Sequence, residues 1–265
     1  MPDSPRNAYT SFWDQTGNHF PSLKGAPSTA YYAACEQTLL DTYFPALQDR
    51  LLLKTDLWDE AKNTEILRWA AERGARPVGV DIAASTVKQA RAVMRDHGLL
   101  CAAGDVRQLP FRSDAFDLIY SMGTIEHFPE TQTALEEMFR VLKPGGVAII
   151  GVPNLLDPFL RPLLVRFIET VARYPYGMEK AYTAGALRRM VRAAGFHVTG
   201  LSGILFMPGW LRMLDLWLHA RRSPWTRLTA ALVVPFAWAY RRFPAVRRHG
   251  YLIACVATKP DGDAI

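Results

Sequence analysis

Short apolar runs alternate with longer amphipathic segments along most of the chain. The apolar runs predict strands at 51–53, 78–80, 99–103, 116–120, 147–152, 196–201 and 251–258. Helical periodicity predicts helices at 29–43, 63–72, 85–97, 131–142 and 183–194. Residues 1–27 contain four prolines and are predicted to be irregular. Strands that alternate with helices of this length predict right-handed βαβ units and a doubly wound α/β sheet.

The carboxyl ends of three successive predicted strands carry acidic residues. Asp56 follows the first strand, Asp81 the second and Asp105 the third. In an open α/β sheet the ligand binds at this edge, and a carboxylate after the second strand can accept both ribose hydroxyl protons. The same acids would also serve as caps of the following helices.

The segment 114–127, with Leu-Lys-Pro-Gly-Gly at 142–146 and the apolar run 147–152, resembles the second half of a class I S-adenosylmethionine (SAM) methyltransferase of the small-molecule and quinone group. The resemblance implies a Rossmann-like, seven-stranded sheet whose last strand is antiparallel. It further implies SAM as cofactor, Asp81 at the ribose, and Asp105 with the Val106 amide at the adenine. Ile82 and Leu109 would then enclose the ring, and the strand end would contribute Ser121, Met122 and Gly123.

The loop after the first strand departs from this family's pattern. The family has acid-x-Gly-x-Gly-x-Gly there, whereas this chain has Lys54 at the acid position and Asp56, Trp58 and Glu60 at the glycine positions. In one interpretation Asp56 or Asp59 replaces the missing carboxylate, so Lys54, Thr55 and Asp56 still contact the cofactor. In the other, the site has lost SAM, and the protein is a non-catalytic or altered-ligand relative that binds and regulates.

Two residues after the fourth strand are the candidate acid–base pair. Methyl transfer needs alignment and exclusion of water, and a base only where the acceptor atom carries a proton. Glu126 and His127 follow Gly123 closely and are the catalytic candidates. His19 is a weaker candidate, which would reach the site if the aromatic N-terminal segment folds over it as a lid.

Charge is distributed unevenly between the two parts of the chain. Residues 1–150 hold 15 Lys/Arg and 19 Asp/Glu, a net charge of −4, whereas residues 151–265 hold 16 and 6, a net charge of +10. This asymmetry indicates an anionic partner for the C-terminal part. The three cysteines show neither metal-ligand nor disulfide spacing, which favours a reducing cytoplasm and predicts no metal site.

Residues 203–249 hold eight arginines, eight aromatic residues and a single acid, Asp215. In the predicted helix 209–220, Arg212, Asp215 and His219 form one polar stripe and apolar residues cover the rest. This segment either contacts an anionic membrane surface or forms a helical cap or dimer contact. Nothing in it favours binding to nucleic acid. The run 228–240 is too short to span a bilayer.

These features predict three parts: an N-terminal segment and helix at 1–48, a methyltransferase-like domain at 49–202 plus 250–259, and a helical insertion at 203–249. The leading functional hypothesis is SAM-dependent methyl transfer to a small, apolar or lipid-like acceptor by a cytoplasmic protein, with peripheral attachment to a membrane as a further expectation.

Overall fold

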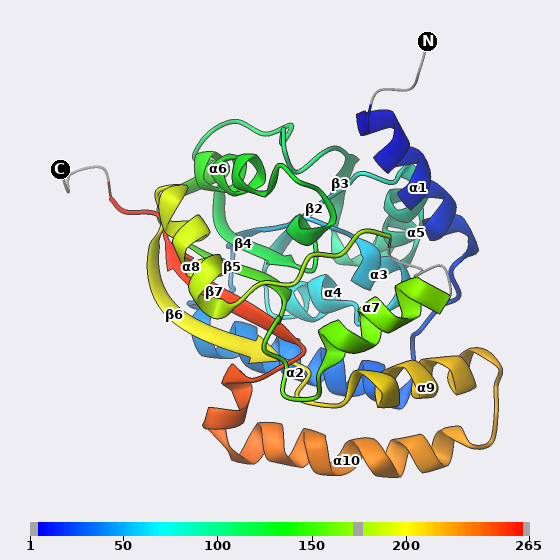
Figure 1. The fold of residues 1–265 in the computed structure, drawn as a ribbon. Helices are drawn as coiled ribbons and strands as arrows, with labels where there is room; N and C mark the ends of the chain where they lie inside the picture. The colour runs from blue at the N-terminus through cyan, green and yellow to red at the C-terminus, as the bar shows by residue number, and fades with distance from the viewer. Residues whose placement is uncertain (1–4, 172–176, 262–265) are drawn as a thin grey trace.

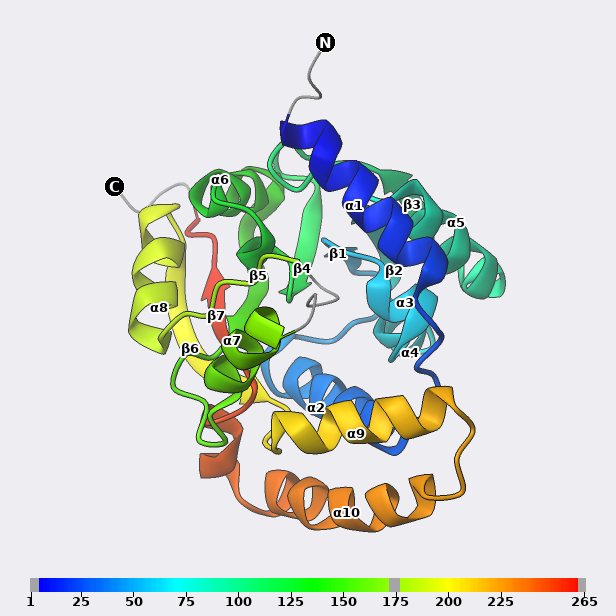
Figure 2. The same ribbon diagram turned by 45° about the vertical axis from the view of Figure 1, so that its right-hand side comes forward.

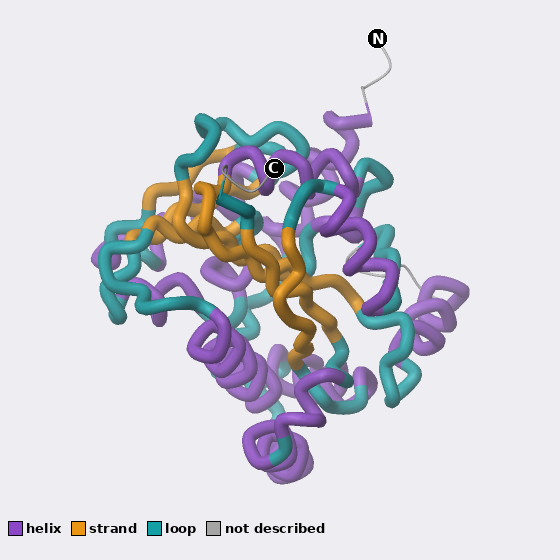
Figure 3. The backbone as a smooth tube through the Cα atoms, turned by 90° about the vertical axis from the view of Figure 1, so that its left-hand side faces the viewer, coloured by secondary structure: helices purple, strands orange, loops and turns teal. Residues whose placement is uncertain are grey.

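A computed structural model describes residues 5–171 and 177–261 and shows one seven-stranded sheet with helices on both faces (Figures 1 and 3). The strand order is β3-β2-β1-β4-β5-β7-β6, and β7 runs antiparallel to both of its neighbours. The predicted doubly wound sheet with an antiparallel last strand is therefore confirmed. The strands are β1 Leu51–Lys54, β2 Arg76–Asp81, β3 Leu100–Ala103, β4 Phe116–Met122, β5 Leu142–Pro153, β6 His197–Ile204 and β7 Leu252–Thr258.

Alternation along the central strands divides the core between the two faces of the sheet. Successive side chains of a strand point to opposite faces, so Leu52 and Tyr120 pack in one apolar cluster with α2 and α4, whereas Leu53 and Ile119 pack in the other with α6 and α8. The helices of the core domain are α2 Pro27–Tyr43, α3 Trp58–Lys62, α4 Ile66–Ala71, α5 Ala84–Val93, α6 Thr131–Val141, α7 Arg161–Val171 and α8 Ala184–Ala193. Three 3-10 segments complete the set: η1 Arg95–His97, η2 Ile125–His127 and η3 Pro244–Arg248.

One sequence prediction about local structure was wrong. The N-terminal segment forms a helix, α1 Pro5–His19, because its proline occupies the first helical position, where no backbone N–H is needed. The helix predicted at 63–72 is present as α4, but it begins later, at Ile66, after Glu65 with φ of 56°. A short separate helix, α3, precedes it and ends at Lys62. The helix α7 was not predicted at all.

The predicted insertion between the last two strands forms two helices, α9 Gly209–Ala220 and α10 Thr226–Arg242. They lie along one border of the molecule beside α2, with α7 next to α9 (Figures 1 and 2). Among the described residues, no helix is both long and apolar enough to cross a membrane.

Candidate active site

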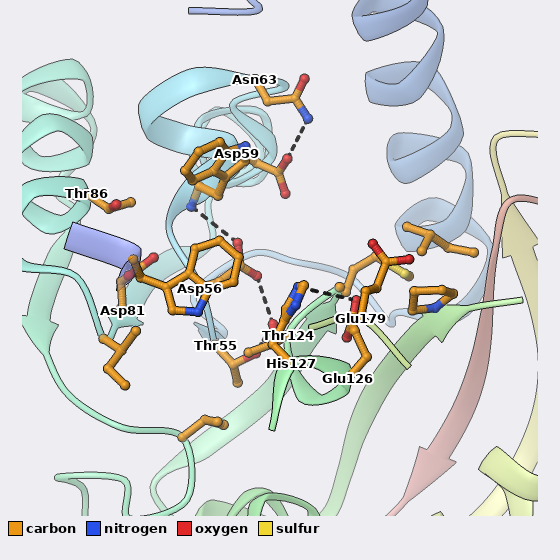
Figure 4. Close-up of a pocket in the computed structure, with 18 of the residues that line it drawn as sticks. Thr55, Asp56, Asp59, Asn63, Asp81, Thr86, Thr124, Glu126, His127 and Glu179 are labelled. Carbon is orange, nitrogen blue, oxygen red and sulfur yellow. Dashed lines mark hydrogen bonds and ion pairs between the residues drawn. The ribbon is translucent and has the colours of Figure 1, made fainter. Parts of the chain in front are cut away.

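A pocket lies where β1, β2, β3, β4 and β5 end at the carboxyl edge of the sheet (Figure 4). This is the position at which open α/β sheets bind ligands. Ten of the residues predicted for the site line the pocket: Thr55, Asp56, Asp81, Ile82, Asp105, Val106, Met122, Gly123, Glu126 and His127. Gly123 adopts φ of +77°, a left-handed conformation that glycine reaches without steric cost and that turns the chain away from β4.

Asp81, the last residue of β2, is held in place by two backbone donors. Its carboxylate accepts hydrogen bonds from the amides of Leu57 and Ala83, each at 2.8 Å. The side chain is nearly buried, and this burial raises the pKa of Asp81 to about 7. Because each carboxylate oxygen has two lone pairs, the group keeps acceptor capacity toward the pocket.

Asp105, after β3, is fixed by an ion pair with Arg107. The guanidinium lies 2.7 Å from the Asp105 carboxylate and also binds Glu130 at 2.8 Å. The guanidinium sits over the ring of Phe128, 4.9 Å from its centre. Asp105 and Val106 therefore form a rigid wall of the pocket. Leu109, expected to face an adenine ring opposite Ile82, is instead buried in the core and does not line the pocket.

The loop after β1 carries a buried ion cluster in place of a glycine-rich turn. The ammonium of Lys54 lies 2.9 Å from Asp56, 3.0 Å from Asp59 and 3.5 Å from Glu60, and its side chain has no exposed surface. Burial alone would lower the pKa of Lys54, but these carboxylates raise it well above the ordinary value, so the group stays charged.

This cluster corrects the expected position of two residues. Lys54 and Ser121 do not line the pocket, because Lys54 points into the ion cluster and the buried Ser121 hydroxyl is bonded to Thr55 at 2.7 Å. Asp56 and Asp59 do line it, and Asp56 accepts a hydrogen bond from Thr124 at 3.1 Å. The loop therefore presents carboxylates, not the lysine, to a ligand (Figure 4).

His127 and Glu126, in η2, meet at the other end of the pocket. His127 Nδ1 lies 2.8 Å from the Met178 carbonyl, which can only accept, so Nδ1 carries the proton and Nε2 keeps its lone pair. Burial lowers the pKa of His127, so the ring is neutral at neutral pH. Burial and the nearby Glu179 raise the pKa of Glu126 well above its usual range. His127 Nε2 and the Glu126 carboxyl are 3.8 Å apart.

Several lining residues lie outside any motif that the sequence reveals. Arg161, at the start of α7, binds Glu179 with 2.8 Å between Nη2 and Oε2, and it stacks on Tyr251 at 3.9 Å. Arg212 of α9 and Tyr32 of α2 also line the pocket. No local pattern marks these residues, since segments far apart in the sequence bring them together.

Two residues of helix α1, Tyr9 and Trp13, line the pocket, whereas the lid function expected of the N-terminal segment stays a prediction. Trp13 lines the pocket and contacts His127 edge to face, with ring centres 4.8 Å apart. Asp14 anchors the helix by accepting the Ser85 amide at 2.8 Å. His19 does not reach the site: it is exposed at the end of α1 and is bonded to Gln15.

Comparison with known proteins shows similarity to methyltransferases over part of the chain. The family described as "Methyltransferase domain" matches residues 63–150. A rice (Oryza sativa subsp. japonica) 24-methylenesterol C-methyltransferase 2 is 31% identical over 169 residues, covering 60% of this chain and 42% of that protein. A ubiquinone biosynthesis O-methyltransferase of Aeromonas salmonicida is 25% identical over 147 residues, covering 52% and 60%. The chain thus spans less than two thirds of the length of either relative.

Solved structures agree on the fold. An S-adenosylmethionine-dependent methyltransferase from Mesorhizobium loti has a TM-score of 0.58 at 18% identity, covering 89% of this chain and 100% of that one. The [4+2]-cyclase SpnF has a TM-score of 0.60 at 21% identity, covering 87% and 81%. The sheet order and the site at its carboxyl edge define a Rossmann-like methyltransferase fold. Residues 63–150 thus resemble a methyltransferase domain, and the chain as a whole has the fold of an S-adenosylmethionine-dependent methyltransferase.

The residues of the pocket fit SAM, the cofactor for which the Mesorhizobium loti methyltransferase of the same fold is named. SAM combines a cationic sulfonium and ammonium with a ribose and an adenine. Asp56 and Asp59 supply negative charge at the loop, while the one cation there is buried and paired. Asp81 is fixed at the strand end with acceptor capacity to spare. The feature that placed SAM in doubt, a lysine at the acid position, is therefore compensated within the loop.

Proposed function

We propose that this protein transfers a methyl group from SAM to a small, apolar, lipid-like acceptor. The observation that carries the proposal is one pocket lined both by Asp56, Asp59 and Asp81 and by the neutral His127 with Glu126, whose pKa is raised by burial. When bound, SAM supplies a methyl group that is activated by a positively charged sulfur.

The protein's own contribution is alignment, exclusion of water and removal of a proton. Tyr9 and Trp13 of α1 line the pocket, and Trp13 packs against His127, so these aromatic rings would help to exclude water from the reacting atoms. His127 Nε2 is the acceptor for a proton that leaves a hydroxyl or amine as it is methylated. The Glu126 Oε2 atom is buried without a hydrogen-bond partner among the described residues, so it is available to orient the acceptor.

The apolar part of the pocket lining supports an apolar acceptor. Leu23, Tyr32, Leu205, Tyr251 and Leu252 belong to it, beside the charged Arg161, Glu179 and Arg212. Similar proteins are named for sterol, hydroquinone and ubiquinone-pathway methylation, all of which involve apolar or prenylated molecules. These names support the acceptor class, and they do not identify the acceptor.

Calorimetric titration with SAM and S-adenosylhomocysteine tests cofactor binding. We expect saturable binding of both, and an Asp81→Ala variant should bind about 10- to 100-fold more weakly, because hydrogen bonds to a charged group contribute about 1.5–3 kcal/mol. Asp41→Ala, at an exposed site on α2, is the matched control. Folded protein that takes up neither ligand would overturn the proposal.

Methyl transfer itself is tested with radiolabelled SAM and a total lipid extract as acceptor. We expect label in the organic phase, and a His127→Gln variant should lose activity while it still binds SAM. The rate should rise with pH through a value below the ordinary histidine pKa of about 6.5, because only the neutral ring accepts a proton. Label that stays entirely in the aqueous phase would rule out a lipid acceptor.

A further inference from the structure

The helix α9 buries charged side chains and exposes large apolar ones, unlike an ordinary surface helix. Its polar residues face the protein: Asp215 accepts the Ser28 amide at 2.8 Å and the Thr229 hydroxyl, and Arg212 donates to the Ser28 carbonyl at 3.2 Å. Asp215 is 0% exposed and Arg212 only 8%. Two of the three residues in the polar stripe of α9 are thus buried against the protein.

The opposite side of α9 exposes large apolar residues. Trp210, Met213, Leu214 and Trp217 are 55%, 43%, 41% and 52% exposed. Their spacing of three and four residues places them on one outward face. Large apolar side chains gathered in this way on an exposed surface mark an interaction site.

The two neighbouring helices extend this surface. On α10, Leu228, Leu232 and Trp238 are 53%, 43% and 54% exposed, and on α7, Leu163 and Phe167 are 62% and 63% exposed. The helices α7 and α10 both contact α9 and lie on the same side of the molecule (Figures 1 and 2). The exposed apolar side chains of these helices are called the three-helix surface below.

Exposed arginines border the three-helix surface. Arg221 and Arg222 follow α9, Arg227 begins α10, and Arg241 and Arg242 end it. Arg221 lies over the Trp217 ring, 4.0 Å from its centre. Within the described residues of α7, α9 and α10, the only acids are Glu169 and the buried Asp215.

We propose that the three-helix surface docks on an anionic lipid membrane. Tryptophan and leucine would enter the boundary between headgroups and acyl chains, and the arginines at the helix ends would bind lipid phosphates. The positive charge of this surface favours the membrane over a second copy of the chain. A second copy would present an equally positive surface, whereas an anionic bilayer carries the opposite charge.

Docking would also bring the pocket close to the membrane. Arg161 of α7 and Arg212 of α9 line the pocket, so two of the helices that carry the three-helix surface also contribute to its lining. Delivery of an acceptor from the bilayer rests on the proposed function, but membrane binding does not.

Vesicle flotation with the full chain tests docking. We expect the protein to float with vesicles of phosphatidylcholine containing phosphatidylglycerol at low salt, and to bind less as salt rises. Trp217→Ser/Trp238→Ser should weaken binding at least about tenfold, since affinity scales with buried apolar area. Arg221→Gln/Arg222→Gln should weaken it about fivefold for each arginine, which corresponds to about 1 kcal/mol.

Matched controls change the same residue types elsewhere. Leu100→Ser removes an apolar side chain that is 65% exposed on β3, and Lys88→Gln/Arg95→Gln removes two cations from α5 and η1. Both should bind vesicles like the original chain. Folded protein that does not float, or a dimer in sedimentation velocity that the tryptophan substitutions abolish, would overturn the proposal. Neither result depends on methyl transfer, so a failure here is distinct from a failure of the proposed function.

Discussion

The loop after β1 and the helix α9 both bury charged side chains, but with opposite results. In the loop, Lys54 is compensated by carboxylates around it, so the cluster is internal and the carboxylates define one wall of the pocket. In α9, Asp215 and Arg212 are bonded to the backbone of α2, so the face that carries Trp210 and Trp217 lies outward. The same physical requirement, that buried charge be paired, shapes a site in one region and an exposed surface in the other.

The largest expected effect comes from removing the cation of the loop. Lys54→Met leaves Asp56, Asp59 and Glu60 buried or partly buried without their partner, which should cost about 3–5 kcal/mol of the free energy of unfolding. Urea denaturation at pH 7 measures it, with Lys88→Met as the surface control. A loss below about 1 kcal/mol would contradict the charged state assigned to this cluster.

A smaller loss is expected when the buried acid of α9 is removed. Asp215→Ala leaves the Ser28 amide without its acceptor and the Thr229 hydroxyl with only the Thr226 carbonyl, at a cost of about 1–3 kcal/mol. Hydrogen exchange should show faster opening of α9 and of the start of α2. Asp41→Ala, at an exposed position, provides the comparison, and equal stability of the two variants would show that Asp215 does not hold α9 in place.

Protonation of Glu60 gives the stability of the loop a pH dependence. Burial raises the pKa of Glu60 to about 7, above the value of about 4.3 in an unfolded chain. Between these values the folded protein holds more protons than the unfolded one, so stability falls as pH rises.

Glu60→Gln isolates this contribution, because the new side chain still accepts the Leu67 amide. From pH 5 to pH 7.5 the original chain should lose about 2 kcal/mol more of its free energy of unfolding than the variant. Glu136→Gln on the exposed face of α6 should behave like the original chain. Parallel pH curves for Glu60→Gln and the original chain would show that Glu60 does not titrate in this range.

The sequence predicted the sheet and the position of the site better than it predicted the direction of individual side chains. Most strands and the acids Asp81 and Asp105 followed from short-range patterns, because strand alternation and strand ends are local properties. The direction of Lys54 also had a local signal, since it lies two residues after Leu52 and so points to the same face of the sheet.

The orientation of α9 had no such signal. Periodicity separates the polar stripe from the apolar one, but the buried side is decided by the Ser28 backbone, which lies far away in the sequence. The same holds for Arg161 and Glu179, whose partnership spans 18 residues and whose place in the pocket depends on the packing of α7. Contacts between distant segments are therefore the part that pattern alone leaves open.

The smallest expected effect separates the two faces of α9 directly. Trp217→Ser should change the free energy of unfolding by no more than about 0.5 kcal/mol, because its side chain is 52% exposed and contributes little to the core. Leu211→Ala, on the buried side of the same helix and 2% exposed, should cost about 2–5 kcal/mol. Urea denaturation of the two variants measures both. If Trp217→Ser were as costly as Leu211→Ala, the apolar face would be part of the folded core and would not be free to bind a membrane. A large vesicle-binding defect without a stability defect is the result that docking requires.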